Sequence, residues 1–353
     1  ATTTVIQSAA VIDMDETGTL TITSANGAET ATSVGAITRS DGNPTVIIQA
    51  LAADTDDESL AVASITFAVT GEGDVKVTAA NNAANDGDFT TTIGDFSTLG
   101  KFELDGNDAG GAASALVVNL TGTTAVTEAS TAVSAAKNSI NLNISGTSTT
   151  FTNGYAMDAV TGSVTLTMSG SAAQTFTGAV TVADDADGKI DITNTAGTTF
   201  ASLVGAAGAN RLGEVDINAS AIATFSNIVA TDLLEVVGSV TLAENNNDAL
   251  DFNLGASSKL IVGKTVVAGE TLITDVANAS PTVTSGAKLY APINLKTGTA
   301  IILTDGADGA GDDATMIAAL TTAAVDSVIM DYTVTADAAN DQSDLNATAK
   351  TIA

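Results

Sequence analysis

The sequence of 353 residues contains no cysteine, no histidine and no tryptophan. Without cysteine a disulfide framework is excluded, and without cysteine and histidine a thiolate or imidazole metal site is excluded too. A Ser-His-Asp catalytic triad cannot be built without histidine. Any metal site in this chain must therefore use oxygen ligands.

Basic residues are scarce as well. Eleven Lys and Arg stand against 41 Asp and Glu, which gives a formal charge of −30. Phosphate binding needs a basic surface, so we expect no nucleic-acid partner. An acidic surface attracts divalent cations instead. No run of eighteen apolar residues occurs, so we expect no membrane-spanning helix.

The first residues, Ala1-Thr2-Thr3-Thr4, lack a starting Met. Such an end suits cleavage of a signal peptide after small residues, so we expect an extracellular protein. Aromatic residues are few, with nine Phe and three Tyr. Ala, Val, Ile and Leu supply most of the apolar side chains, which favours thin layers of small β-branched residues over one thick core.

The middle of the chain carries an internal repeat. Five of the nine Phe recur at a nearly constant interval, and four of them follow a Thr. These five residues are Phe151, Phe176, Phe200, Phe225 and Phe252. A pair of alternating apolar residues lies at the same offset before three of them, such as Ile190 and Ile192 before Phe200. Period-2 alternation predicts a strand in each repeat.

A strand in every unit of about 25 residues is typical of a solenoid, in which neighbouring units stack. We predict an all-β parallel β-helix in which the Phe rings form an internal ladder at the strand spacing of about 4.8 Å. A leucine-rich repeat has a similar period, and Leu212-Gly213-Glu214-Val215-Asp216-Ile217 resembles its pattern. The units lack a Leu-rich helix, which favours the β-helix.

The repeat predicts three regions: a β-rich region at 1–98, the solenoid at 99–290, and a capping and assembly region at 291–353. Residues 1–100 are interpreted as an antiparallel sandwich or as an irregular start of the solenoid. Two segments are predicted to be short capping helices, the Ala-rich residues 125–137 and residues 312–324.

Acidic turns are the sequence feature with the most pointed chemistry. Calcium takes six to eight oxygen ligands from carboxylates, carbonyls and water, so clusters of Asp predict calcium sites. The predicted metal ligands are Asp184, Asp185, Asp187, Asp191, Asp305, Asp308, Asp312 and Asp313. The alternative is that Asp, Asn and Gly simply form turns here. Five glycosylation sequons also occur, at Asn119, Asn143, Asn218, Asn278 and Asn346.

The composition, the acidic turns and strand units such as Val164-Thr165-Leu166-Thr167-Met168 resemble those of bacterial S-layer proteins. The resemblance covers roughly residues 95–290, and the chain departs from it in lacking tandem calcium nonapeptides. It implies a lattice of identical subunits on the cell surface, often bridged by calcium and attached to a surface glycan.

We therefore expect a non-enzymatic homo-oligomeric subunit of a self-assembling surface layer. Two alternatives stay open. One is an extracellular filament, in which Thr2-Thr3-Thr4-Val5-Ile6 adds a strand to the next subunit. The other is a carbohydrate-active β-helix enzyme, which the absence of Trp and the scattered basic residues disfavour.

Overall fold

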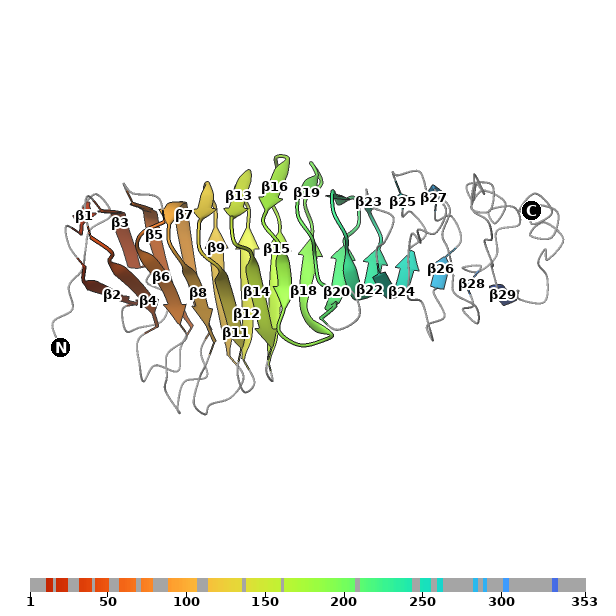
Figure 1. Cartoon of the computed structure of the whole chain (residues 1–353), viewed down its shortest axis with the longest axis horizontal. Helices are drawn as coiled ribbons and strands as arrows, with labels where there is room; N and C mark the ends of the chain where they lie inside the picture. Colours follow the sequence, from red (N-terminus) through yellow and green to blue (C-terminus); the bar gives the residue numbers. More distant parts are fainter. Residues whose placement is uncertain are drawn as a thin grey trace.

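The computed structural model shows an elongated all-β solenoid of parallel strands, as the repeat predicts (Figure 1). It describes residues 11–14, 17–24, 32–39, 42–50, 57–67, 71–78, 88–106, 114–134, 138–159, 162–206 and 210–242, and the backbone of strands at 248–254, 259–262, 282–284, 288–290, 301–304 and 332–335. These residues include no helix, and so none that could cross a membrane.

The strands form three rows, and neighbours within a row pair in parallel. The first row is β1 (Ile12–Asp13), β3 (Thr32–Arg39), β5 (Glu58–Phe67), β7 (Phe89–Leu99), β9 (Ala115–Leu120), β12 (Ser139–Ile144), β15 (Ser163–Met168), β18 (Asp187–Ile192), β20 (Leu212–Ile217), β22 (Ala230–Val236), β24 (Asp248–Leu254), β26 (Thr282–Thr284), β28 (Ile301–Thr304) and β29 (Tyr332–Thr335).

The second row is β10 (Thr124–Val126), β13 (Ser148–Phe151), β16 (Gln174–Thr177), β19 (Thr198–Phe200), β21 (Ile222–Phe225), β23 (Ser239–Leu242), β25 (Lys259–Val262) and β27 (Lys288–Tyr290). The third row is β2 (Thr19–Thr23), β4 (Thr45–Gln49), β6 (Asp74–Thr78), β8 (Phe102–Asp105), β11 (Ser130–Ser134), β14 (Tyr155–Ala159) and β17 (Val180–Val182). One turn of the chain through the rows is called a rung below.

Strand β7 joins the first two rows. Its beginning pairs with β9 and its end pairs with β10, so one long strand of the early rungs corresponds to two strands of the later ones. Every strand before β7 also pairs in parallel. The antiparallel sandwich is therefore wrong for residues 1–100, whose described strands form the irregular start of the solenoid. The predicted boundary at residue 98 is not a break in the strand pairing.

The core follows from alternation, because every second residue of each strand points inward. The length of a rung is the number of residues between register partners on successive rungs. One series of inward-pointing register partners in the first row shows how this length varies. Its members, all buried, are Val34, Val62, Ile93, Leu120, Ile144, Met168, Ile192, Ile217 and Val236. The rungs are longest before Leu120, nearly constant from Leu120 to Ile217, and shortest from Ile217 to Val236. The predicted period thus holds in the middle of the solenoid only.

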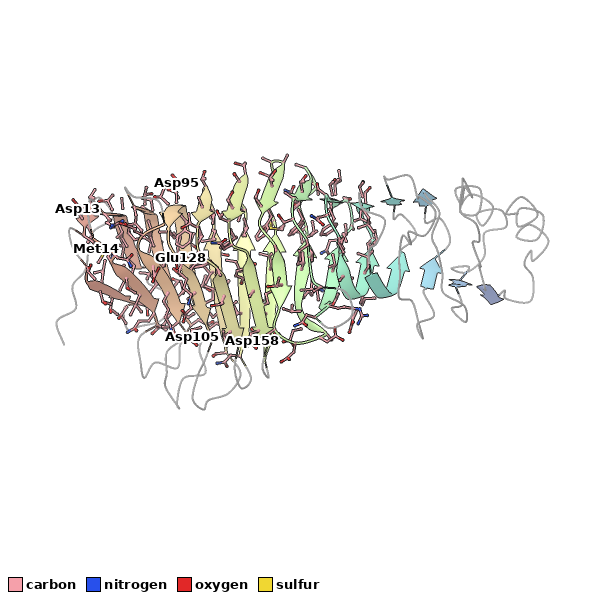
Figure 2. All side chains as sticks on the ribbon, viewed as in Figure 1. Asp13, Met14, Asp95, Asp105, Glu128 and Asp158 are labelled. Atoms are coloured by element: carbon pink, nitrogen blue, oxygen red, sulfur yellow. The ribbon has the colours of Figure 1, made fainter. Side chains whose placement is uncertain are left out.

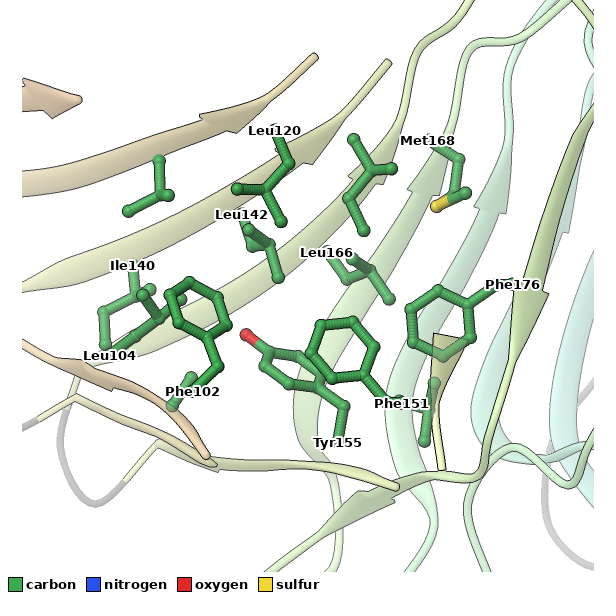
Figure 3. Packing of buried hydrophobic residues seen from close by; sticks show 14 of the residues in the cluster. Phe102, Leu104, Leu120, Ile140, Leu142, Phe151, Tyr155, Leu166, Met168 and Phe176 are labelled. Carbon is green, nitrogen blue, oxygen red and sulfur yellow. The ribbon is translucent and has the colours of Figure 1, made fainter. Parts of the chain in front are cut away.

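The predicted aromatic ladder is present. Successive ring centroids of Phe151, Phe176, Phe200 and Phe225 lie 5.4, 5.4 and 5.0 Å apart, close to the strand spacing of about 4.8 Å. All four rings are buried, and Figure 3 shows those of Phe151 and Phe176. Toward the N-terminus Phe102 continues the stack, with its ring 6.4 Å from that of Phe151.

Phe252 was predicted to be the fifth ring of the ladder, and its strand contradicts this. The register partner of Phe225 is Leu242, in β23, whereas Phe252 lies in β24 of the first row opposite Leu234. The reason is that the rung after β20 is shorter than the rungs before it. A fixed period therefore assigns Phe252 to the wrong row.

The helix predicted for residues 125–137 is also wrong. This segment contains the end of β10 and all of β11, and β11 pairs with β8 and β14 on either side. Val126 and Ala132 point inward and are buried. Tertiary pairing between two existing strands thus overrides the helix propensity of Ala. The other predicted helix, at 312–324, lies outside the described residues.

Buried amide side chains occupy the bends between strands, where backbone groups leave the sheet ladders. Asn138 donates its Nδ2 hydrogen to the carbonyl of Gly106 at 2.8 Å and accepts from the amide of Ser114 at 3.2 Å. Gln174 and Asn194 play the same part at another bend and bond to each other at 2.7 Å. Because a buried polar group without a partner is costly, these amides fix which rungs meet.

Tyr155 is one of several buried side chains near the ladder, with Thr124 and Thr149, whose hydroxyl has no hydrogen-bond partner in the described part of the chain. Its ring centroid lies 5.4 Å from that of Phe151 (Figure 3), and the side chain is fully buried. We predict that Tyr155→Phe raises the free energy of unfolding by about 1 kcal/mol, because it removes a buried hydroxyl that only water could satisfy. Urea denaturation measures this change.

The pH dependence supplies a control for Tyr155→Phe. Burial raises the pKa of Tyr155 far above its ordinary value, so the unfolded chain loses this proton first as the pH rises. The free energy of unfolding should therefore fall above about pH 10 in the wild type, and fall less in Tyr155→Phe. The reverse change, Phe176→Tyr, should destabilise. A Tyr155→Phe variant less stable than the wild type would contradict the prediction.

Candidate functional site

Charged side chains gather on the outer face of the first row, over β18, β20 and β22. Inward positions of these strands hold apolar residues such as Ile190 and Val215, so alternation sends the charged residues outward. The register places Asp191 opposite Asp216, and Asp216 opposite Glu235. One carboxylate therefore stands on each of three successive rungs.

Three carboxylates of this face form a group that could hold a cation. The ligand oxygens of Glu214, Asp216 and Glu235 all lie within 4.8 Å of one another, and each side chain is half-buried. Within the described part of the chain this is the one group of three such ligands. Carboxylate oxygens are the ligands that calcium prefers, with water completing its six to eight positions.

Lys189 already neutralises part of this acidic group. Its Nζ lies 2.9 Å from Oε1 of Glu214 and 3.0 Å from Oδ2 of Asp216. Partial burial lowers the pKa of Lys189, but the hydrogen bonds and charges of the two carboxylates outweigh it, and the pKa is raised above its usual value. A cation that binds the three carboxylates must therefore compete with the ammonium group.

Asp191 stands at the edge of the group. Burial and then the charge of Asp216 raise its pKa, while Lys189 and the amide of Asn218, which donates to Asp191, oppose that rise. The net pKa of Asp191 is above its usual value. A carboxylate held in this way favours protonation and is mildly destabilising when charged.

The four predicted ligands in the turn before β18 and in the strand itself are not brought into one site. Asp185 accepts a hydrogen bond from the amide of Arg211 at 2.9 Å, and its other oxygen lies 3.6 Å from the Arg211 guanidinium. Asp187 accepts from the amide of Ala159 at 3.3 Å. Asp184 donates its backbone amide to Asp187, and Asp191 bonds Asn218. Asp185 and Asp191 thus serve separate local bonds, and Asp184 and Asp187 are the one pair among the four that meets.

The other four predicted ligands, Asp305, Asp308, Asp312 and Asp313, lie outside the described residues. Sequence reasoning missed Glu214, Asp216 and Glu235. A signal for the first two exists, because the alternating Glu214-Val215-Asp216-Ile217 predicts both carboxylates on the outer face. Glu235 could not be found in the same way. The period of the central rungs, about 25 residues, predicts Thr241 rather than Glu235 as the neighbour of Asp216.

We predict that Asp191→Asn raises the free energy of unfolding at pH 7, by about 0.5 kcal/mol or less for a half-exposed group. Because the pKa of Asp191 is raised in the folded chain, the folded state binds the proton first, and stability should rise as the pH falls from neutral through that pKa. In the Asp191→Asn variant the free energy of unfolding should increase less as the pH falls. Denaturation at several pH values measures both effects.

Glu103 in β8 is the matched control with the opposite sign. Burial raises its pKa, but hydrogen bonds from Lys101 and Lys76 outweigh burial and lower it. Its contribution to stability is present at neutral pH and is lost as the pH falls through the lowered pKa. Glu103→Gln should therefore destabilise at pH 7 where Asp191→Asn stabilises. Equal effects of both changes would contradict the assignment.

Three predicted sequons lie within ordered hydrogen-bonded positions. Asn143 donates to Asn119 at 2.9 Å, and Asn119 donates to Thr92 at 3.3 Å, on successive rungs of the first row. Asn218 donates to Asp191. Attaching a glycan to any of these amides would remove a bond between rungs. Asn278 and Asn346 lie outside the described residues.

Comparison with known proteins identifies no relative, since no family model, no curated protein and no solved structure matches the chain. The geometry therefore defines the chain as a parallel β-solenoid in which three carboxylates lie close together on the outer face.

Proposed function

We propose that the chain is a structural subunit of a self-assembling extracellular surface layer. The observation that carries the proposal is the fold itself: one continuous core runs through successive parallel rungs and leaves long regular faces exposed (Figure 1). Each rung stabilises its neighbours, so the subunit is a rod whose faces repeat at the strand spacing. Repetitive faces of this kind suit contacts between many identical copies.

The charge distribution explains why assembly would need a cation. Acidic side chains lie along both long sides of the rod, with Asp13 and Asp95 on one and Asp105 and Asp158 on the other (Figure 2). Rods with a charge of −30 repel one another at low salt. Divalent cations between acidic faces would remove that repulsion, so we include calcium in the proposal, together with a surface glycan as the anchor.

The carboxylates Glu214, Asp216 and Glu235 are the calcium ligands we propose for the described part of the chain. Calcium at about ten times its dissociation constant should raise the free energy of unfolding by about 1.4 kcal/mol. Glu235→Gln should abolish this increase, whereas Glu103→Gln, a carboxylate already paired with two lysines, should keep it. Thermal unfolding with calcium or with a chelator measures the difference. An increase that survives Glu235→Gln would contradict the assignment.

Negative-stain microscopy of the purified chain tests the proposed function. We expect two-dimensional sheets with calcium and their loss when a chelator is added. Particles that stay single at every calcium and protein concentration would overturn the proposal. Screening by monovalent salt is the control, because it lowers repulsion without bridging carboxylates.

A filament built by strand addition is the second candidate, and the open edge of β2 described below favours it. In that case residues 2–6 of one chain would add a strand to another. Deleting residues 1–10 would then dissolve the assembly, whereas a lattice held by the faces of the rod would survive. A carbohydrate-active enzyme is a further outcome, and release of reducing ends from polysaccharides by the wild type but not by an Asp216→Asn variant would reveal it.

A further inference from the structure

The third row of strands has two ends, and the structure closes one of them. At β17 the amide of Val180 donates to the carbonyl of Leu203 at 3.0 Å, and Gly205 donates to the carbonyl of Val180 at 2.9 Å. The side chain of Asn210 then donates to the carbonyls of Val182 and Ala183 at 3.1 and 2.6 Å. These bonds cover the edge of β17 at both of its ends.

At the opposite end of the row, the outer edge of β2 has no strand partner among the described residues. Thr45 donates to Gly18 at 2.8 Å and Ser24 donates to Gln49 at 3.1 Å, which fixes the hydrogen-bond pattern between β2 and β4. In a parallel ladder alternate residues bond the same neighbour, so Leu20 and Ile22 bond β4. The amides and carbonyls of the three Thr of β2 face the other way, where no strand of the described residues pairs with them.

The β2 edge also lacks the usual protection. Its sequence, Thr19-Leu20-Thr21-Ile22-Thr23, contains no charge and no Pro, the residues that normally guard an exposed edge. The core beneath it is unfinished. Leu20 is only half-buried, although its register partner Val46 is fully buried. An added strand would complete both the ladder and the core.

We infer that two copies of the chain join head to head, each adding its β2 to the β2 of the other. The closed edge at β17 is the reason for this orientation, because head-to-tail addition in the third row would need an open edge there. A two-fold axis makes the added strands antiparallel and the contact self-complementary. The inference deepens the proposed function by naming one contact of the assembly.

The outward-facing backbone groups fix the register of this contact. Thr21 faces the partner's Thr21, and Thr19 faces the partner's Thr23, so that each pair exchanges two main-chain hydrogen bonds. Leu20 then packs beside the partner's Ile22 on the core side of the sheet. Asp13 lies at the same end of the rod (Figure 2). Repulsion between the acidic ends should therefore make the dimer stronger as salt is added.

A cysteine variant tests the contact, because the chain has no cysteine of its own. Facing residues of a hydrogen-bonded antiparallel pair have Cα atoms about 5.5 Å apart, within the range of about 4.4–6.8 Å that a disulfide spans. Thr21→Cys should therefore oxidise to a covalent dimer. Thr131→Cys, on the same face but in the interior strand β11, should stay monomeric. A mixture of Thr19→Cys and Thr23→Cys should crosslink better than either alone.

Sedimentation velocity of the whole chain without calcium supplies the second readout. The wild type should dimerise reversibly, and Thr21→Lys should weaken the dimer about tenfold or more, since it sets two like charges face to face. Thr131→Lys is the matched control and should have no effect. A wild type that stays monomeric at high salt, or a Thr21→Cys thiol that stays free, would overturn the inference and show that the edge is covered by another segment. The lattice seen with calcium can fail while this dimer forms, and the reverse, so the two ideas are tested separately.

Discussion

Replacing Phe200 with alanine should lower the free energy of unfolding of its rung by about 3–5 kcal/mol, the range for a buried aromatic residue. The ring is buried between those of Phe176 and Phe225, with centroids 5.4 and 5.0 Å away. In a solenoid each rung is stabilised mainly by its neighbours, so the loss should spread to β16 and β21. Native-state hydrogen exchange of these three strands measures it.

Thr199→Ala is the matched control for Phe200→Ala, because Thr199 is the preceding residue and points outward. It should change the stability by no more than about 0.5 kcal/mol. Combining Phe200→Ala with Phe225→Ala should reveal a coupling of about 0.5–1.5 kcal/mol, since the two rings stack. A cost below about 1 kcal/mol for Phe200→Ala would show that the ladder does not stabilise the rod.

The ladder is also the part of the fold that the sequence predicted best. Alternation of Ile190 and Ile192 and the return of Phe at a constant offset are properties of short segments, and stacking of parallel strands turns both into vertical lines. Because most rungs repeat the last one, one correct register predicts most of its neighbours, although in β13 Thr149 rather than Phe151 is the register partner of Phe176. This is why Phe151 to Phe225 were placed correctly without any knowledge of the turns between them.

Prediction failed where rung length or neighbouring strands decide the outcome. The rung after β20 is short because β22 begins directly after the bridge residue Val229, whereas residues 205–211 separate the corresponding bridge residue Val204 from β20. No local sequence pattern predicts this difference. That change moved Phe252 out of the ladder and brought Glu235 beside Asp216. The helix prediction for residues 125–137 failed for a related reason, since pairing with β8 and β14 on either side makes this segment a strand, β11.

The acidic turns show the limit for the candidate site. Asp185 and Asp187 belong to the residue type that binds calcium and also to the type that forms turns. Sequence alone does not say whether a carboxylate meets another carboxylate or a backbone amide. In the structure Asp185 accepts a hydrogen bond from the Arg211 amide, and Asp187 accepts one from the Ala159 amide. The carboxylates that do lie close together come instead from outward positions of neighbouring strands. Strand register, rather than clustering in sequence, determines which acids meet.

Replacing Gln174 with leucine should destabilise the solenoid by at least about 3 kcal/mol, because several buried polar groups would each lose a partner at about 1–3 kcal/mol. Its Nε2 donates to the carbonyls of Ile144 and Gly146, both at 2.9 Å. Its Oε1 accepts from Gly170 at 3.2 Å and from Asn194 at 2.7 Å. Leucine fills a similar volume, so the change tests the hydrogen bonds rather than the packing.

Thr175→Leu is the control, since it places the same side chain one position along at an exposed site and should cost no more than about 0.5 kcal/mol. Urea denaturation gives the total loss, and faster exchange of the Gly170 amide locates it at the bend. Replacing Phe200 and replacing Gln174 should have different effects on the pairing of the strands. Loss of the ring leaves the pairing of the rungs unchanged, whereas loss of the amide frees the bend that sets which residues of β13, β16 and β19 lie opposite one another. A Gln174→Leu variant as stable as the wild type would mean that strand pairing alone fixes the register.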